Sequence, residues 1–295
     1  MIIVKLMGGL GNQMFQYAIG RQLSIINGTV LKLDLSFLLD RTPREHFTFR
    51  DFDLGVFNIE ADYTVDSDIA NFINNDLISK LQRIFRQKKL INEASLSFQP
   101  NVLNLGDNVY LDGYWQCEKY FNSIRNEILN DFTLNQSTLG KLHENVLLQE
   151  TKELMLKSNS VSVHFRRGDY ISDNATNNFH GICSTEYYQD AIKLIAQKIQ
   201  SPHFFLFSDD TEWLLNNRII DNFPTTVVKT SDMHLDMYLM SLCKNNIIAN
   251  SSFSWWGAWL NRNIEKLVIA PQRWFANHER NQQTMDLIPQ NWIRL

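Results

Sequence analysis

Short apolar runs alternate along this chain with longer segments whose apolar residues recur at helical spacing. Residues 2–6 form a compact apolar run, and residues 29–35 form a second one. Between them, glycines at 8–11 indicate a turn, and residues 12–26 carry apolar side chains three or four positions apart. This pattern predicts a strand, a tight turn, a helix and a second strand, which together make a β-α-β unit.

The second half of the chain repeats this alternation more regularly. It predicts five strands and four helices, with the strands over 160–165, 203–207, 225–228, 246–249 and 266–270 and the helices over 184–200, 211–216, 235–243 and 253–261. Such alternation is typical of parallel sheets covered by helices. Between the halves we expect an irregular region with a helix over 76–89, a strand over 109–115 and a helix-rich stretch over 120–157. The interruption near 150–159 predicts two α/β domains, 1–155 and 156–295.

Length, charge and cysteine content restrict the function classes. A chain of 295 residues with 44% hydrophobic residues can form two ordinary domains, and its formal net charge of −4 argues against nucleic acid as a partner. The opening residues lack the pattern of a secretory signal, and no segment has the ~20 apolar residues of a membrane span. Three scattered cysteines, Cys117, Cys183 and Cys243, fit reduced thiols. We therefore expect a cytoplasmic protein.

Two adjacent arginines follow one of the predicted buried strands. Arg166 and Arg167 come directly after the apolar run 160–165. Paired guanidiniums at a strand end are costly to desolvate without an anionic partner, and phosphate suits their forked donors. The sequence therefore predicts an anion site, although nearby carboxylates such as Asp169 and Asp173 could instead hold the pair.

The glycine turn near the amino terminus has two interpretations. Gly9 and Gly11 are followed by Met14 where the dinucleotide-binding fingerprint needs a third small residue, yet Asp34 ends the next strand at about the expected distance. This combination gives weak support to a nicotinamide-dependent oxidoreductase. Otherwise the turn is purely structural, or it brings backbone N–H groups and Asn12 close to an anion or a sugar hydroxyl.

Polar residues also follow other strands of the second half. Ser251 and Ser252 come after the strand 246–249, where they can cap the next helix and form a second phosphate cradle. The tryptophans within 255–259 have a spacing typical of core packing. Asp209 and Asp210 could bind a metal or cap a helix, and the Asp-X-Asp patterns at 51–53 and 66–68 are too common to carry weight.

Five motifs in a fixed order resemble a known family. They are Gly8-Gly9-Leu10-Gly11-Asn12-Gln13-Met14-Phe15-Gln16-Tyr17-Ala18, Asp112-Gly113-Tyr114-Trp115-Gln116, His164-Phe165-Arg166-Arg167-Gly168-Asp169-Tyr170, Phe207-Ser208-Asp209-Asp210 and Asn250-Ser251-Ser252-Phe253-Ser254-Trp255-Trp256-Gly257-Ala258-Trp259. Together they resemble the bacterial α-1,2-fucosyltransferases over nearly the whole chain. The His-X-Arg-Arg segment is also similar to that of α-1,6-fucosyltransferases and protein O-fucosyltransferases.

The resemblance implies a fold and a reaction. The fold is two facing Rossmann-like domains of the GT-B type, with the acceptor on domain 1–155 and GDP-fucose on domain 156–295. The reaction is an inverting, metal-independent transfer of L-fucose from GDP-β-L-fucose to the 2-hydroxyl of a terminal galactose, with no cofactor. The acceptor implied is a β-galactoside glycan of a bacterial surface polysaccharide or its lipid-linked precursor, which allows at most peripheral association with the inner membrane face.

The resemblance also assigns residues. Arg166 and Arg167 match arginines that hold the donor pyrophosphate, His164 matches a residue that lies against the nucleotide, and Ser252 matches a phosphate-side serine. Asp236 matches a carboxylate that reads the guanine edge, or it is simply a residue at the start of a helix. The full donor-binding set that we expect is His164, Arg166, Arg167, Asp209, Asp236, Ser251 and Ser252. The expected catalytic residues are Arg166, Asp169 and Asn12, with no metal ligand.

The general base and several alternatives stay open. Asp169, Asp173 and His180 are candidates for the base, and Asp169 could equally orient an arginine. An α-1,6 or α-1,3 fucosyltransferase and a divalent-metal-dependent transferase are the nearer alternatives. A nucleotide-dependent oxidoreductase and a non-catalytic sugar-binding module are the more distant ones.

Overall fold

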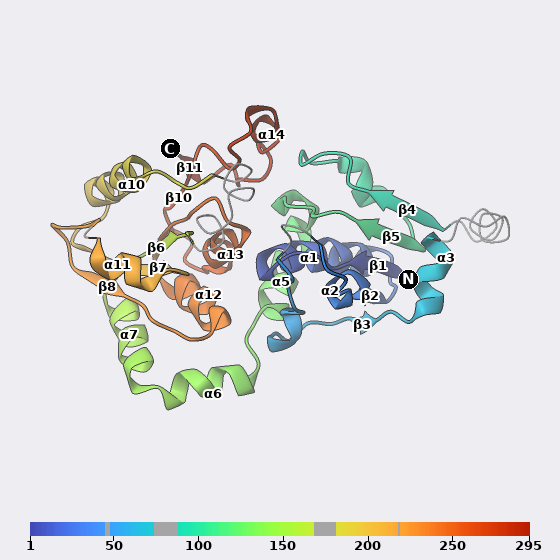
Figure 1. The fold of residues 1–295 in the computed structure, drawn as a ribbon, viewed down its shortest axis with the longest axis horizontal. Coiled ribbons are helices and arrows are strands. Elements are labelled where there is room, and N and C mark those ends of the chain that lie inside the picture. The colour runs from blue at the N-terminus through green and yellow to red at the C-terminus, as the bar shows by residue number, and fades with distance from the viewer. Residues whose placement is uncertain (45–47, 74–87, 168–180, 218) are drawn as a thin grey trace. The chain divides into compact units, whose positions relative to one another are not determined.

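The chain folds into two compact units, each built on a parallel sheet (Figure 1). The computed structural model describes residues 1–44, 48–73, 88–167, 181–217 and 219–295. Unit 1 comprises Met1–Thr133 and Met285–Pro289, and unit 2 comprises Leu134–Thr284 and Gln290–Leu295. The sequence placed the division after residue 155. The structure places it earlier, because the two helices that follow Thr133 belong with unit 2.

Unit 1 contains a five-stranded sheet with every neighbouring pair parallel. The spatial order is β3-β2-β1-β5-β4. The strands are β1 (Ile2–Lys5), β2 (Leu31–Asp34), β3 (Asp62–Tyr63), β4 (Lys89–Asn92) and β5 (Val109–Asp112). Because β1 lies in the middle of the order and is almost entirely buried, its apolar run is continuous rather than alternating.

The α-helices that the structure describes in unit 1 are α1 (Leu10–Ile26), α2 (Ser36–Leu39), α3 (Asp66–Ile73) and α5 (Arg125–Asp131). The α1 helix packs against β1 and β2, and thirteen of its residues are buried. The predicted helix over 76–89 falls mostly on residues outside the described ranges, and its last residue belongs to β4. The predicted strand over 109–115 ends earlier, at Asp112, and the residues after it form a loop.

The segment Met285–Pro289 returns to unit 1 and is attached there by Asp286. This carboxylate accepts hydrogen bonds from the backbone N–H of Phe98 at 3.0 Å and from Nζ of Lys119 at 2.5 Å. The chain therefore passes between the units three times, after Thr133, after Thr284 and after Pro289.

Unit 2 contains a six-stranded sheet that is also parallel between all neighbours. Its order is β11-β10-β9-β6-β7-β8. The strands are β6 (Asn159–Phe165), β7 (Pro202–Ser208), β8 (Thr225–Val227), β9 (Asn245–Ile247), β10 (Val268–Ala270) and β11 (Ile293–Arg294). The chain builds outward from β6 in one direction through β7 and β8, and then in the other through β9, β10 and β11. The position between β6 and β9 is thus a topological switch point, where open α/β sheets bind their ligands.

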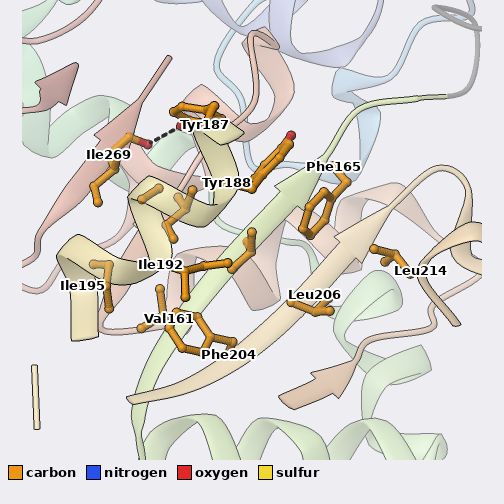
Figure 2. Packing of buried hydrophobic residues seen from close by; sticks show 13 residues of the cluster. Val161, Phe165, Tyr187, Tyr188, Ile192, Ile195, Phe204, Leu206, Leu214 and Ile269 are labelled. Atoms are coloured by element: carbon orange, nitrogen blue, oxygen red, sulfur yellow. Dashed lines mark hydrogen bonds between the residues drawn. The ribbon is translucent and has the colours of Figure 1, made fainter. Parts of the chain in front are cut away.

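Seven helices are described in unit 2: α6 (Gln136–Glu144), α7 (Val146–Lys157), α10 (Thr185–Lys198), α11 (Thr211–Asn216), α12 (Met233–Leu242), α13 (Ser252–Leu260) and α14 (His278–Gln282). Figure 2 shows α10 packed on the sheet, with Ile192 above Val161 and Phe204 and with the Tyr188 ring beside that of Phe165. Helix α12 packs against both α13 and α7. In the described part of the chain, no helix is long and apolar enough to cross a bilayer.

Several sequence predictions about the fold are confirmed. Both halves of the chain form helix-covered parallel sheets, as the alternation of strands and helices indicates. The tryptophans at 255, 256 and 259 are almost completely buried, with two T-shaped ring contacts and one stacked contact among them. They are core residues, as their spacing suggests.

Candidate functional site

The candidate site of unit 2 lies at the carboxyl end of its sheet, beside the switch point. His164 is the penultimate residue of β6, and Arg166 and Arg167 follow the strand directly. Asp209 follows β7, the neighbour of β6 on one side. Ser251 comes a few residues after β9, the neighbour on the other side. The parallel sheet therefore gathers five of the predicted site residues at one edge, although they are far apart in the sequence.

Asp209 links the ends of β6 and β7. One of its oxygens, Oδ2, lies 2.7 Å from Nη1 of Arg166, and the other accepts the backbone N–H of Arg167 at 2.9 Å. The sequence left open whether local carboxylates hold the arginines. The structure shows that a carboxylate does so, but it comes from the next strand. Asp169 and Asp173, the residues considered for this role, lie outside the described residues.

Arg167 has a second attachment, to helix α11. Its guanidinium carbon lies 3.7 Å from the centre of the Trp213 ring, and its Nε lies 3.5 Å from Oδ2 of Asp210. Asp210 also caps α11 by accepting the backbone N–H of Trp213 at 3.0 Å. Asp210 thus has the capping role that the sequence offered as an alternative to metal binding. The contribution of Trp213 was missed, since a single tryptophan inside a predicted helix carries no signal of its own.

His164 is a neutral, buried group at this edge. Its side chain is 4% exposed, and within the described residues its Nδ1 atom has no hydrogen-bond partner. Burial lowers the pKa of His164 to about 4, with Asp209 opposing that shift and Arg166 adding to it. Its ring packs against Phe253 of α13, with centroids 5.5 Å apart. At neutral pH the imidazole can therefore accept or donate a hydrogen bond without bringing a charge.

The first turn of α13 provides backbone donors next to His164. Ser251 is the N-cap residue, and its carbonyl oxygen accepts a hydrogen bond from the backbone N–H of Trp255 at 3.0 Å. The backbone amides of Ser252 and Phe253 lie before Trp255 in the first turn of the helix, at the end where the macrodipole favours an anion. We expected the serine hydroxyls to cap the helix. The structure corrects this, because the side chain of Ser251 makes no capping bond and Ser254 turns inward to Ala249.

Asp236 lies on the helix that follows β8, the strand beside β7. It belongs to the first turn of α12, and it accepts a hydrogen bond from Oγ1 of Thr230 at 2.8 Å. Burial raises the pKa of Asp236 to about 7, and the nearby Asp232 adds to the shift while the Thr230 hydrogen bond opposes it. Asp232 is itself paired with Lys141 at 2.8 Å and caps α12. A partly exposed carboxyl group with a pKa near neutral pH is a candidate for recognising a ligand with N–H donors.

Asn12 lies in unit 1, at the start of α1. Its Oδ1 accepts a hydrogen bond from Nε2 of Gln116 at 2.7 Å. The turn before it needs glycine at position 8, where φ is +76° and a Cβ atom would collide with Nδ2 of Asn12. Gln13 and Gln16 are buried and tie this turn to other loops of unit 1. The polar residues of this motif thus shape the turn, and among these three Asn12 is the one with partial exposure.

Asp34 does not have the position that a dinucleotide-binding carboxylate needs. It is completely buried, and its oxygens accept hydrogen bonds from the hydroxyl of Tyr110 at 2.5 Å and from the backbone N–H of Ser36 at 2.8 Å. A ribose hydroxyl needs an accessible carboxylate at this place. The observation that favoured an oxidoreductase is therefore explained by the structure of the turn after β2.

Acidic motifs do not assemble a metal centre in the part of the chain that the structure describes. No group of three or more His, Cys, Asp or Glu side chains there could hold a metal ion. Asp51 pairs with Arg41, and Asp68 with Lys32 at 2.8 Å, so one carboxylate of each Asp-X-Asp pattern is in an ion pair. The absence of a metal requirement in the reaction stays a prediction.

The fold and the site together define a class of protein. Two helix-covered parallel sheets, one with arginines, a buried histidine and a helix amino terminus at its switch point, are typical of α/β proteins that bind nucleotides. The chain belongs to glycosyl transferase family 11, whose profile matches residues 1–295. It is a glycosyltransferase of this fucosyltransferase family, as the sequence motifs suggested.

Two bacterial relatives align with the chain over almost their whole length. An alpha-1,2-colitosyltransferase of Escherichia coli is 34% identical over 301 residues, which cover 100% of this chain and 98% of the relative. The O-antigen biosynthesis glycosyltransferase WbnK of Escherichia coli is 36% identical over 312 residues, with 98% and 99% covered. A galactoside 2-alpha-L-fucosyltransferase SEC1 of Bos taurus is 29% identical over 160 residues, with 52% of this chain and 43% of the relative covered.

A solved structure supports the fold. A mutant of Arabidopsis thaliana FUT1 in complex with GDP superposes with a TM-score of 0.51 at 11% identity, covering 90% of this chain and 69% of that protein. At this identity the likeness concerns the fold alone. It agrees with the α/β architecture of helix-covered parallel sheets described above.

Proposed function

We propose that this glycosyltransferase transfers L-fucose from GDP-β-L-fucose to the 2-hydroxyl of a terminal galactose, with inversion at the sugar. The observation that carries the proposal is the cluster of His164, Arg166 and the α13 amino terminus at the switch point of unit 2. Family membership and the galactoside 2-fucosyltransferases among the relatives support the sugar and the linkage.

The site of unit 2 suits a guanosine diphosphate. The diphosphate would bind between Arg166 and the first-turn amides of α13. Asp236 lies on α12, the helix that follows β8, and β8 is two strands from β6 in the same sheet. A carboxylate there can accept the two adjacent N–H groups of guanine, which adenine and the pyrimidines do not present in that arrangement.

The chemistry requires positive charge at the leaving group. As the bond between fucose and diphosphate breaks, the sugar takes on oxocarbenium character and the diphosphate gains negative charge. A guanidinium at about 4 Å is worth roughly 1 kcal/mol in water and about 4 kcal/mol at the effective dielectric of a protein site. We assign this stabilisation to Arg166. Because a guanidinium carries five N–H donors, Arg166 can keep its contact with Asp209 while other donors bind phosphate.

The acceptor hydroxyl must lose a proton to a base. Asp169 keeps its place as a candidate, with Asp173 and His180 behind it, and all three lie outside the described residues. Asn12 contributes to catalysis from unit 1 by hydrogen bonding. We place the acceptor glycan on unit 1 and the nucleotide on unit 2, and we expect no cofactor and no metal.

Product analysis tests this proposal. The protein is incubated with GDP-, UDP- and CMP-sugars and a β-galactoside, with and without excess chelator, and the products are identified by mass and linkage analysis. We expect an α-1,2-fucosylated galactoside from GDP-fucose alone, with the rate unchanged by chelator. A product with an α-1,6 or α-1,3 linkage would overturn the linkage, and an absolute requirement for manganese would overturn the metal-free mechanism.

A second donor is favoured by one observation. The colitosyltransferase aligns with the whole chain, whereas the galactoside fucosyltransferase SEC1 aligns with about half of it. Colitose is L-fucose without the 3-hydroxyl, so one site could accept either sugar. Comparing kcat/KM for GDP-fucose and GDP-colitose decides between them. A clear preference for fucose supports the proposal, and a clear preference for colitose makes the protein a colitosyltransferase.

A further inference from the structure

The loop that follows β5 is a strained segment beside the unit 1 sheet. We call residues 113–116 the 113–116 loop. Trp115 within it has a φ of +56°, a left-handed conformation that bulky residues rarely adopt. At Gly113 a Cβ atom would collide with Cβ of Glu93, so the loop passes very close to the residue after β4. Backbone strain of this kind persists only where surrounding contacts fix it, and it is concentrated at functional sites.

Glu93 fixes the centre of this loop. Its carboxylate accepts the backbone N–H of Tyr114 at 2.7 Å and the backbone N–H of Trp115 at 3.0 Å. Glu93 follows β4 and is partly buried, and this burial raises the pKa of its carboxyl group. The carboxylate therefore gives up hydration in order to bind two successive amides of one loop.

Both ends of the loop are fixed as well. Nε2 of Gln16 donates to the carbonyl of Gly113 at 3.1 Å, and Nε2 of Gln116 donates to Oδ1 of Asn12 at 2.7 Å. Between them the Trp115 side chain is fully buried and meets the Tyr120 ring edge-on, with centroids 5.7 Å apart. Each of the four residues of the loop is therefore held by a hydrogen bond. One of these bonds is made with Asn12, a residue that we expect to take part in the reaction.

The loop presents sugar-binding chemistry at the sheet edge. The Tyr114 side chain is 39% exposed, and an aromatic ring with a polar tip suits the apolar face and the hydroxyls of a sugar. The charged residues at the carboxyl ends of β1, β4 and β5 are Lys5, Glu93 and Asp112, and Lys5 is paired with Asp112 at 2.9 Å. This edge therefore suits a neutral, hydroxyl-rich ligand rather than a diphosphate.

We propose that Glu93 is a positioning residue for the acceptor glycan, acting by holding the 113–116 loop in the conformation that binds the acceptor galactoside. The inference rests on the proposed function, because the acceptor is defined only by that reaction. Glu93 itself touches the loop backbone and acts through Tyr114 and Gln116. It belongs to none of the sequence motifs, and it was missed by sequence reasoning because its role depends on the contact between β4 and β5.

The test distinguishes an effect on acceptor binding from an effect on donor binding. The variants Glu93→Ala and Glu93→Gln are compared with the wild type and with Glu127→Ala, which removes an exposed carboxylate of helix α5. We measure the KM for a β-galactoside at saturating GDP-fucose, the KM for the donor, and donor hydrolysis without acceptor. For Glu93→Ala we expect a marked rise, on the order of tenfold, in acceptor KM, with donor KM and hydrolysis close to wild type. Glu93→Gln, which keeps one accepting oxygen, should lie between.

Two further measurements keep the outcome clear if Glu93→Ala fails to fold. Tyr114→Ala changes an exposed side chain and should also raise the acceptor KM alone. Hydrogen exchange of the Tyr114 and Trp115 amides should be faster in Glu93→Gln than in the wild type. An unchanged acceptor KM in folded Glu93→Gln and Tyr114→Ala, or equal losses for donor and acceptor, overturns the inference. A wild type that transfers no GDP-sugar to any galactoside overturns the proposed function, and the acceptor assignment with it.

Discussion

The guanidinium of Arg167 lies over the indole ring of Trp213, 3.7 Å from its centre. The same arginine lies near Asp210, which also caps the helix that carries Trp213. Arg166, its neighbour in the sequence, instead pairs with Asp209 at 2.7 Å. The two arginines of the motif therefore have different surroundings. One is held against helix α11, and the other pairs with a carboxylate through a guanidinium that can also bind a phosphate.

Removing the ring from position 213 should weaken donor binding. A cation–π contact of this kind is worth about 0.5 to 2 kcal/mol, so Trp213→Ala should raise the KM for GDP-fucose about two- to thirtyfold. Trp213→Phe keeps a ring and should recover most of the loss. Steady-state kinetics with circular dichroism as the folding check make the comparison. A donor KM equal to wild type in a folded Trp213→Ala protein would contradict this role for the stack.

Removing the Arg166 guanidinium should affect turnover most strongly. Loss of one donor to the developing charge typically costs ~2.7 to 4 kcal/mol of barrier, so Arg166→Ala should lower kcat at least a hundredfold while the protein stays folded. Arg166→Lys keeps the charge without the fork and should fall between. The matched control is Arg262→Ala, an exposed arginine beyond the carboxyl end of α13. Wild-type turnover by Arg166→Ala would remove this residue from the mechanism.

Donor binding should weaken as the pH falls through 7. Burial raises the pKa of Asp236 to about 7, and guanine N–H donors prefer its ionised form. If only that form binds, the Kd of GDP-fucose rises about tenfold between pH 8 and pH 6. GDP-fucose is the right probe because its diphosphate has no terminal phosphate group that ionises in this range. Asp236→Asn should bind more weakly at pH 8 and lose the pH dependence, and a wild-type Kd that stays flat would rule out this contact.

The same carboxyl group should also affect stability. Its pKa is raised to about 7 in the folded protein from an ordinary value of 3.8, so the folded state binds the extra proton between about pH 4 and pH 7. The stabilisation is complete below about pH 4 and is lost as the pH rises through 7. Denaturant titrations of wild type and Asp236→Asn should therefore diverge over this range, with the wild type losing stability relative to the variant as the pH increases. Parallel curves for the two proteins would contradict the raised pKa.

The hydroxyl of Tyr187 should be important for the stability of unit 2. It donates to the carbonyl oxygen of Ile248 at 2.7 Å and to that of Ile269 at 3.2 Å. Figure 2 shows the bond to Ile269, which lies in β10, and Ile248 directly follows β9. Tyr187→Phe should lower the free energy of unfolding by about 1 to 3 kcal/mol, because buried carbonyl groups lose a donor. Six of the seven tryptophans belong to unit 2, so tryptophan fluorescence follows its unfolding. The control variant Tyr63→Phe, at an exposed position, should change the free energy of unfolding by less than about 0.5 kcal/mol.

The sequence was enough to predict which candidate residues lie together where the ends of strands alone determine their place. Arg166, Asp209 and Ser251 each follow a predicted strand, and parallel pairing is enough to bring such residues to one edge. Asp34 shows the limit of this rule, because it also ends a strand but points into a turn that buries it. A strand end gives the place of a residue, whereas the direction of its side chain depends on packing.

The residues that were missed depend on contacts between distant segments. Trp213 matters because α11 lies beside the end of β6, and Glu93 matters because the loop after β5 bends back over β4. The predicted division between the units also lies too late in the chain. The sequences of α6 and α7 do not show which unit the two helices pack on, and the structure places them in unit 2. None of these contacts has a local sequence pattern.

The return of residues 285–289 to unit 1 has a consequence for hybrid enzymes. If acceptor choice lies in unit 1, exchanging that unit between family members is the direct way to redirect the enzyme. A hybrid joined only after Thr133 would combine Asp286 of one parent with the Phe98 and Lys119 positions of the other. A functional exchange therefore has to carry this short carboxyl-terminal segment together with the first 133 residues, as a single inherited block.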